Sequence, residues 1–243
     1  MIRTILVVLY LVIFFVISLP LFLVEAIFGK KHKAAMQHMA YKVVSWGFRS
    51  ISWLSGTSLT VIGRENVPAE GAVLYVANHR SYFDIVSIYP YLKDPSAFIA
   101  KKELEKIPLL RRWMRILDCE FLDREDVRAA MKSILGSIES VKAGMSMVIF
   151  PEGTRTPGDE MLEFKEGSFK IAERAGCPVI PVAISNTENI FESHMPSIRK
   201  TRVTIEFGRP VDMLAMDRSE RRHTGRIVQE QIAEMLKKNH IDA

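Results

Sequence analysis

The chain has 243 residues, of which 48% are hydrophobic and 25% are charged, as in typical globular proteins. This composition excludes a disordered chain and a membrane protein with many spans. The net charge of +5 favours an anionic partner, such as a phospholipid surface or a phosphorylated substrate. Nucleic acid is disfavoured, because the sequence contains no recognition motif for it.

Residues 4–24 contain no charged side chain and form a run long enough to cross the hydrocarbon core of a bilayer. The run ends at Glu25 and a basic stretch rather than at small residues, so we expect it to be retained and not cleaved as a signal peptide. Pro20 predicts a kink, and the sequence leaves open whether the segment spans the membrane or stays in one leaflet. A buried core helix is the less favoured alternative.

Residues 36–54 place apolar side chains at helical spacing, which predicts an amphipathic helix. Trp46 and Trp53 suit the headgroup region of a membrane, and anionic lipid would attract the basic cluster at residues 30–33. The alternative is an ordinary helix of the domain with its aromatic side chains in the core. We favour the membrane interface and expect residues 1–55 to form an anchoring segment of two helices.

From residue 56 to residue 243, strand-like and helix-like segments alternate, which predicts a second domain of the α/β class with a mainly parallel central sheet flanked by helices. The candidate strands are residues 59–62, 72–77, 97–100, 119–122, 145–150, 178–184 and 202–207. Residues 125–142 and 219–238 have the clearest helical periodicity, and Asp123 is a candidate cap for the first.

Parallel sheets bind ligands at the carboxyl ends of their strands, so the loops that follow the strands are the candidate sites. Polar clusters follow four of the predicted strands, with the sequences NHRSYFD, KKEL, DR and PEGTRT. We expect these clusters to meet on one rim of the sheet.

His79 and Asp84 lie five residues apart in the stretch VANHRSYFDIV. Inside an α-helix this spacing would separate the two side chains by about 140°. They can touch if His79 lies on the turn after the strand and Asp84 reaches back from the first helical turns. The carboxylate would then fix the imidazole tautomer and stabilise the imidazolium, which makes His79 a candidate general base. Taken alone, the spacing favours a helix-capping aspartate beside a partly exposed histidine.

The stretch VIFPEGTRT has the features of an anion-binding turn. Gly153 allows backbone N–H groups to approach an anion, and Arg155 can bind a phosphate through two parallel hydrogen bonds. Taken by itself, the stretch is best interpreted as a surface turn with an incidental ion pair.

Together the two stretches resemble motifs of the glycerolipid acyltransferases. The short chain with an apolar N-terminus resembles the bacterial type of 1-acylglycerol-3-phosphate acyltransferase. Asn78, His79 and Asp84 correspond to the first motif, asparagine-histidine-x4-aspartate, and residues 150–155 (FPEGTR) to the third. The likeness covers most of the chain.

Two further motifs of the family have counterparts. Residues 118–124 (DCEFLDR) correspond to the second motif and residues 179–184 (VIPVAI) to the fourth. Asp118 stands where the second motif usually has glycine, while Arg124 is in register with its terminal arginine.

The resemblance implies that His79 removes a proton from the sn-2 hydroxyl of 1-acylglycerol 3-phosphate, and that Asp84 orients His79. The hydroxyl oxygen would attack a fatty acyl thioester on acyl carrier protein or coenzyme A, giving phosphatidic acid. The implied substrate-binding residues are Lys101, Arg124, Glu152, Gly153, Thr154 and Arg155. No metal or cofactor is implied, the thioester being a co-substrate, and the catalytic domain is expected on the cytoplasmic face of the cell membrane.

Three alternatives stay open at this point. The acceptor could be another lysolipid, the protein could be a lipid hydrolase in which His79 activates water, or it could be a non-catalytic module that binds anionic lipid. The sequence contains no G-x-S-x-G stretch, which disfavours a serine lipase. Cys119 and Cys177 stand alone, which fits a reducing compartment and disfavours a disulfide framework or a cysteine metal site.

Overall fold

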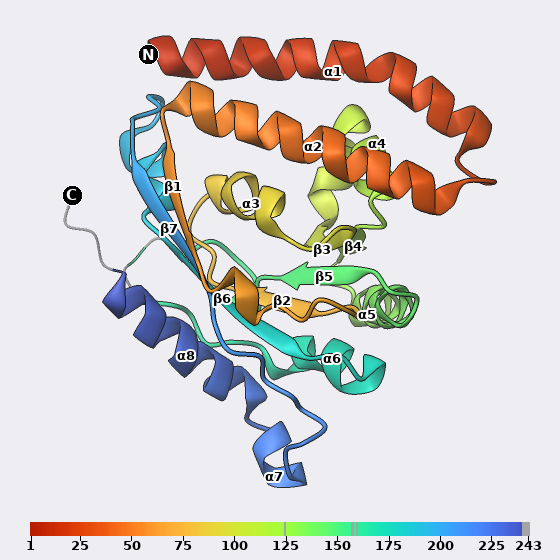
Figure 1. Cartoon of the computed structure of the whole chain (residues 1–243), viewed down its shortest axis with the longest axis vertical. Coiled ribbons are helices and arrows are strands. Elements are labelled where there is room, and N and C mark those ends of the chain that lie inside the picture. Colours follow the sequence, from red (N-terminus) through yellow and green to blue (C-terminus); the bar gives the residue numbers. More distant parts are fainter. Residues whose placement is uncertain (124, 157, 159, 240–243) are drawn as a thin grey trace.

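The fold is built on one central sheet, shown in Figure 1. The computed structural model describes residues 1–123, 125–156, 158 and 160–239. Seven strands make up the sheet in the order β1-β7-β6-β2-β5-β3-β4. Their bounds are Ser58–Ile62 (β1), Leu74–Ala77 (β2), Ser96–Lys101 (β3), Glu120–Leu122 (β4), Ser146–Ile149 (β5), Val179–Ser185 (β6) and Arg202–Phe207 (β7).

The sheet is mainly parallel, as predicted. Strands β6, β2, β5, β3 and β4 run in one direction, whereas β7 pairs antiparallel with β6 and carries β1 parallel to itself. All seven predicted strands are present, with bounds that differ by one or two residues at most. The expected α/β class is therefore confirmed.

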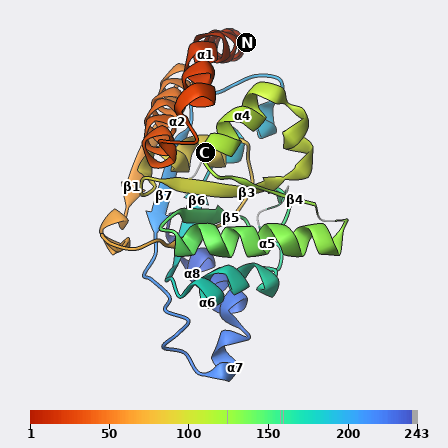
Figure 2. The same ribbon diagram turned by 90° about the vertical axis from the view of Figure 1, so that its right-hand side faces the viewer.

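Helices cover both faces of the sheet. They are α1 (Ile2–Phe28), α2 (Lys33–Ser55), α3 (Phe83–Ile88), α4 (Pro108–Ile116), α5 (Val127–Lys142), α6 (Lys170–Ala175), α7 (Arg218–Arg221) and α8 (Thr224–Lys238). Figures 1 and 2 show α1 to α4 on one side of the sheet and α5, α6 and α8 on the other.

Strand β2 lies in the middle of this three-layer arrangement, and all four of its residues are fully buried. Successive side chains of a strand point to opposite faces. Tyr75 and Ala77 accordingly join the hydrophobic cluster beneath α1 to α4, while Leu74 and Val76 join the cluster that contacts α5, α6 and α8. The strand that leads to His79 is therefore fixed from both sides.

Two details of the predicted helices are wrong. Residues 219–238 do not form one helix, because a capping box between Asp217 and Glu220 starts the short helix α7 and a new helix starts at Thr224. The cap of α5 is Asp126 and not Asp123, since the Asp126 carboxylate accepts hydrogen bonds from the N–H groups at the start of that helix. Asp123 instead accepts from backbone N–H groups in the turn before it.

Helix α2 combines the two interpretations left by the sequence. Its face with Ala40, Val44 and Ile51 is buried in the core, as in an ordinary domain helix. Trp46 and Trp53 are not in that core, because Trp46 is 58% exposed and Trp53 is 79% exposed, whereas Tyr41 of the same helix is buried.

Helix α1 lies along α2 and bends towards its C-terminal end, as Figure 1 shows. It has 27 residues, includes Pro20, and is long and apolar enough to cross a membrane. Only 17% of its most apolar window is buried inside the protein. The division of the chain at residue 55 stays a prediction, although α1 and α2 both contribute side chains to the core beneath them.

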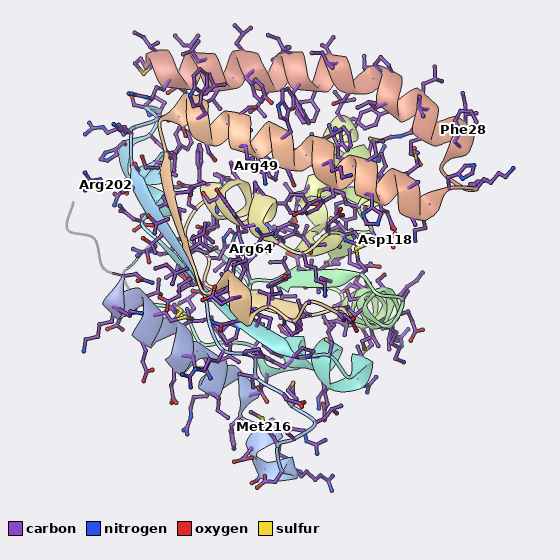
Figure 3. All side chains as sticks on the ribbon, viewed as in Figure 1. Phe28, Arg49, Arg64, Asp118, Arg202 and Met216 are labelled. Carbon is purple, nitrogen blue, oxygen red and sulfur yellow. The ribbon has the colours of Figure 1, made fainter. Side chains whose placement is uncertain are left out.

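Asp118 has a backbone conformation that favours glycine, with φ of 57°. This explains why the corresponding position of the family motif usually holds glycine. In this chain the Asp118 carboxylate also accepts a hydrogen bond from Lys33 Nζ at 2.8 Å, which ties the loop before β4 to the start of α2. Figure 3 shows Asp118 beneath that end of α2.

We predict that Asp118→Gly is more stable than Asp118→Ala by about 1 kcal/mol, because both variants lose the ion pair and only alanine keeps the backbone strain. Urea unfolding of the two variants in the same detergent measures this difference. Equal midpoints would show that the left-handed conformation at residue 118 is not maintained.

Candidate active site

The candidate site lies at the carboxyl ends of the parallel strands. Val76 of β2 is paired with Ile149 of β5, so the two turns that follow these strands, residues 78–84 and 150–156, start side by side. Lys101 ends β3, which is the next strand across the sheet from β5. The structure thus places the polar clusters after β2, β5 and β3 on one rim, as the sequence predicted.

His79 and Asp84 form a direct contact. Their Nδ1 and Oδ2 atoms are 2.8 Å apart, with Asp84 in the first turn of α3 and His79 on the turn before it. An ionised carboxylate can only accept hydrogen bonds, so Nδ1 carries a proton, and in the neutral imidazole Nε2 is the nitrogen with the lone pair. The arrangement leaves Nε2 as the basic atom of the pair.

The Asp84 carboxylate is fully buried and held by several donors. Oδ2 also accepts from the N–H groups of Arg80 at 2.7 Å and Ser81 at 2.8 Å. Oδ1 accepts from the hydroxyl of Thr187, which lies in the turn after β6. Buried charge is costly unless it is hydrogen-bonded, and these donors supply that compensation.

The imidazole is also held by its neighbours. Its ring stacks on Phe150, with 4.2 Å between the ring centroids and 22° between the planes. Just before it, Asn78 is buried and exchanges two hydrogen bonds with the backbone of Ile184, at 2.8 and 2.9 Å. The asparagine of the first motif therefore clamps the end of β2 to β6 and keeps the adjacent histidine in place.

Glu152 connects the two turns. Its carboxylate is buried and accepts from the N–H of His79 at 2.7 Å, from the N–H of Leu162 at 2.9 Å and from the Thr156 hydroxyl. The N–H of Thr156 donates to the carbonyl of His79 at 2.8 Å. Both carboxylate oxygens are thus engaged by the protein itself, which makes Glu152 a brace for the site.

Arg155 lies on the side of Tyr82. Its guanidinium is 3.7 Å from the centroid of the Tyr82 ring and donates from Nη2 to the Tyr82 hydroxyl at 3.0 Å. Nη1 is 3.5 Å from the carboxylate of Glu192, which also accepts from the Ser81 hydroxyl and the Tyr82 N–H. The guanidinium group of an arginine carries five N–H donors. The contacts with Tyr82 and Glu192 use only some of them, so the others can donate to a ligand.

The other predicted binding residues are less enclosed. Lys101 is exposed and pairs with Glu103 at 3.0 Å. Thr154 is exposed, and Gly153 adopts φ of 80°, a conformation in which a side chain is strained. Arg124 lies outside the described residues.

Sequence reasoning missed Thr187 and Glu192. Both follow β6, whose motif had been assigned only to the strand itself. The strand order could have predicted them, because the loop after β6 lies at the same edge of the sheet as the loops after the other parallel strands. Among the described residues, no group of three or more His, Cys, Asp and Glu side chains is placed to hold a metal ion.

A histidine paired with a buried carboxylate, beside cationic groups, suits the attack of a hydroxyl on an acyl group, and comparison with known proteins agrees. Residues 58–185 match the family model described as Acyltransferase. The chain belongs to the Acyltransferase family. It is 31% identical to the 1-acyl-sn-glycerol-3-phosphate acyltransferase of Borreliella burgdorferi over 76% of this chain and 74% of the relative. The Salmonella typhimurium protein of the same name is also 31% identical, over 85% of this chain and 82% of its own.

The fold is shared with an acyltransferase of known structure. The crystal structure of the 1-acyl-sn-glycerophosphate (LPA) acyltransferase PlsC from Thermotoga maritima superimposes with a TM-score of 0.80, covering 99% of both chains at 27% identity. The region matched by the Acyltransferase model runs from β1 to β6 and contains both turns of the site. The resemblance drawn from the two motifs is confirmed.

We predict that Thr187→Val lowers the free energy of unfolding by about 1.5–3 kcal/mol, because valine keeps the shape and removes a donor from a buried carboxylate. Thr187→Ser keeps the hydroxyl and is the matched control, with a smaller expected loss. Chemical unfolding followed by circular dichroism measures both. If valine and serine destabilise equally, the Asp84 carboxylate does not depend on this hydroxyl.

Proposed function

We propose that this acyltransferase transfers a fatty acyl group from an acyl thioester to the sn-2 hydroxyl of 1-acylglycerol 3-phosphate, giving phosphatidic acid for phospholipid synthesis. The observation that carries the proposal is the contact between His79 and Asp84, which leaves Nε2 as a base on the rim. The names of the relatives support lysophosphatidic acid as the acceptor.

In the proposed reaction, His79 Nε2 takes the proton of the acceptor hydroxyl as its oxygen attacks the thioester carbonyl. The buried carboxylate of Asp84 stabilises the imidazolium that forms. The tetrahedral intermediate then expels the thiolate, the C–S bond breaks, and the thiolate receives the proton from the imidazolium. The acceptor is itself the nucleophile, so the enzyme forms no covalent intermediate.

The acceptor's phosphate needs cations close to this base. In the proposal Lys101, Arg155 and Arg124 supply them, and the turn at Gly153 and Thr154 approaches the anion with its backbone. Acyl carrier protein or coenzyme A carries the donor acyl group, and both are acidic partners for a chain with a net charge of +5.

We predict that His79→Ala lowers kcat by about 10²- to 10⁴-fold in protein that is still folded, because the proton transfer is lost. The variant also loses the imidazole donor to Asp84, so its circular dichroism is compared with that of the unchanged protein before the rate is measured. Thiol release from an acyl thioester in the presence of 1-acylglycerol 3-phosphate measures the rate. His38→Ala is the matched control, since His38 Nδ1 also lies 2.8 Å from a carboxylate, that of Asp94, but on an exposed site.

The same assay separates the alternatives. Thiol release that does not need an acceptor would indicate a hydrolase, and equal rates with neutral lysolipids would indicate a different acceptor. Lipid binding without any turnover would indicate a binding module. Near-normal turnover by His79→Ala would falsify the proposed mechanism.

We propose that α1 holds the enzyme in one leaflet of the cell membrane, with the catalytic domain on the cytoplasmic face. The outer side chains of α1 project away from the rest of the molecule in Figure 3. Its inner side is bonded to α4, where the Trp113 indole donates to Ser18 Oγ at 3.2 Å and Arg112 pairs with Glu25 at 2.6 Å. Spanning the bilayer would carry these polar groups of the domain into hydrocarbon.

We predict that replacing Leu9, Val16 and Leu23 together by glutamine lowers binding to phosphatidylglycerol vesicles at least about 100-fold. Each of these side chains is more than half exposed and would be buried by lipid at about 1.5 kcal/mol or more. Vesicle flotation measures the bound fraction.

The control replaces three exposed apolar residues of the opposite side of the sheet, Met131, Leu135 and Leu214, by glutamine. Binding by this control should match that of the unchanged protein. Equal loss in both triple variants would show that α1 is not the anchoring surface.

A further inference from the structure

Lys165 places its ammonium group over the turn that follows β5. Its backbone N–H donates to the carbonyl of Pro151 at 3.2 Å, and the preceding residue, Phe164, is buried in the core. A Cβ atom built on Gly153 would lie 2.7 Å from Lys165 Nζ. The backbone of Lys165 is therefore anchored beside the turn, and its charged end reaches the residue at the turn's centre.

The charge of Lys165 is not compensated within the described part of the chain. Other cations of this rim have a carboxylate partner there. The pairs are Lys101 with Glu103, Lys102 with Asp123, Arg80 with Glu188 and Arg155 with Glu192. For Lys165 the described residues include no carboxylate within ion-pair distance, so its ammonium is available to an anionic ligand.

The turn beneath this ammonium also offers donors. Gly153 has φ of 80°, and the N–H groups of Thr154 and Arg155 have no acceptor among the described residues. Successive N–H groups in a turn form a concavity that binds anions, and an ammonium group over it adds charge. The Lys165 ammonium and the backbone N–H groups of the turn could thus bind the same anion beside Gly153.

This volume lies close to the base. Glu152, next to Gly153, accepts the backbone hydrogen bond of His79, and Phe150 of the same turn stacks on the imidazole. Strand β5, which leads to the turn, adjoins β2, whereas Lys101 ends a strand about 10 Å from β2 across the sheet. In the acceptor only the chain C2–C3–O–P separates the sn-2 carbon from the phosphorus, so the phosphate must bind near His79.

We propose that Lys165 is a specificity-determining residue that binds the phosphate monoester of the acceptor. This inference rests on the proposed function and adds a residue to its site. Coenzyme A carries a phosphate monoester as well, but the acceptor is favoured because its phosphate is held by covalent bonds close to the reacting hydroxyl.

The test compares Lys165→Met, which keeps the length of the side chain, with Lys165→Arg, which keeps the charge. The unchanged enzyme is assayed first with 1-acylglycerol 3-phosphate, 1-acylglycerol, acyl-coenzyme A and acyl-pantetheine. Absence of acceptor-dependent turnover at this stage would overturn the proposed function itself, independently of Lys165. Lys170→Met is the control, since Lys170 is also exposed but pairs with Glu173 at 2.6 Å on α6.

Lys165→Met should raise KM for 1-acylglycerol 3-phosphate about tenfold or more and leave kcat within about twofold, as expected for a contact made equally in the ground state and the transition state. Lys165→Arg should recover most of this loss. Turnover of 1-acylglycerol and KM for both donors should not change. An unchanged KM for the phosphorylated acceptor, an equal loss with 1-acylglycerol, or a rise confined to acyl-coenzyme A would each overturn the proposal.

Discussion

The candidate site depends on how one buried carboxylate is satisfied. Asp84 is fully enclosed, and its charge is compatible with that position only because the imidazole, two backbone N–H groups and a threonine hydroxyl all donate to it. These donors come from the turn after β2 and the turn after β6. The hydrogen bonds to Asp84 therefore fix the imidazole tautomer and also join the end of β2 to the end of β6.

Around Asp84, side chains from one turn of the rim bond to residues of a neighbouring turn or strand. Asn78 bonds the end of β2 to β6, Glu152 bonds the turn after β5 to the backbone of His79, and Glu192 bonds the segment after β6 to Arg155. Buried polar side chains whose hydrogen bonds are satisfied, here Asn78 and Glu152, rigidify the region around them. His79 and the cationic side chains can therefore keep a fixed separation, which the proposed reaction between a hydroxyl and a thioester requires.

The sequence predicted the parts of this arrangement that depend on local pattern. Hydrophobic periodicity predicted the seven strands, and the rule that parallel sheets bind ligands at the carboxyl ends of their strands predicted the rim. The five-residue spacing permitted contact between His79 and Asp84 only if His79 lies on the turn before the helix. Thr187, Glu192 and Lys165 were not predicted, because their roles depend on which loops the topology brings together. The break before α8 was missed for a local reason, since the capping box at Asp217 competes with a helical pattern that continues through it.

In the proposed membrane arrangement, the placement of α1 would set the orientation of the enzyme on lipid. A helix of 27 residues is about 40 Å long, and α1 is fastened to the domain through Ser18 and Glu25 instead of hanging from a flexible linker. A line of contact that long resists tilting along the helix, and the exposed indole of Trp53 on α2 provides a second point away from the line. If α1 and Trp53 both contact lipid, the two contacts would fix the tilt of the domain. The rim of the sheet would then stand at a constant height above the acyl chains, and a lysolipid would rise by the same distance each time to reach it.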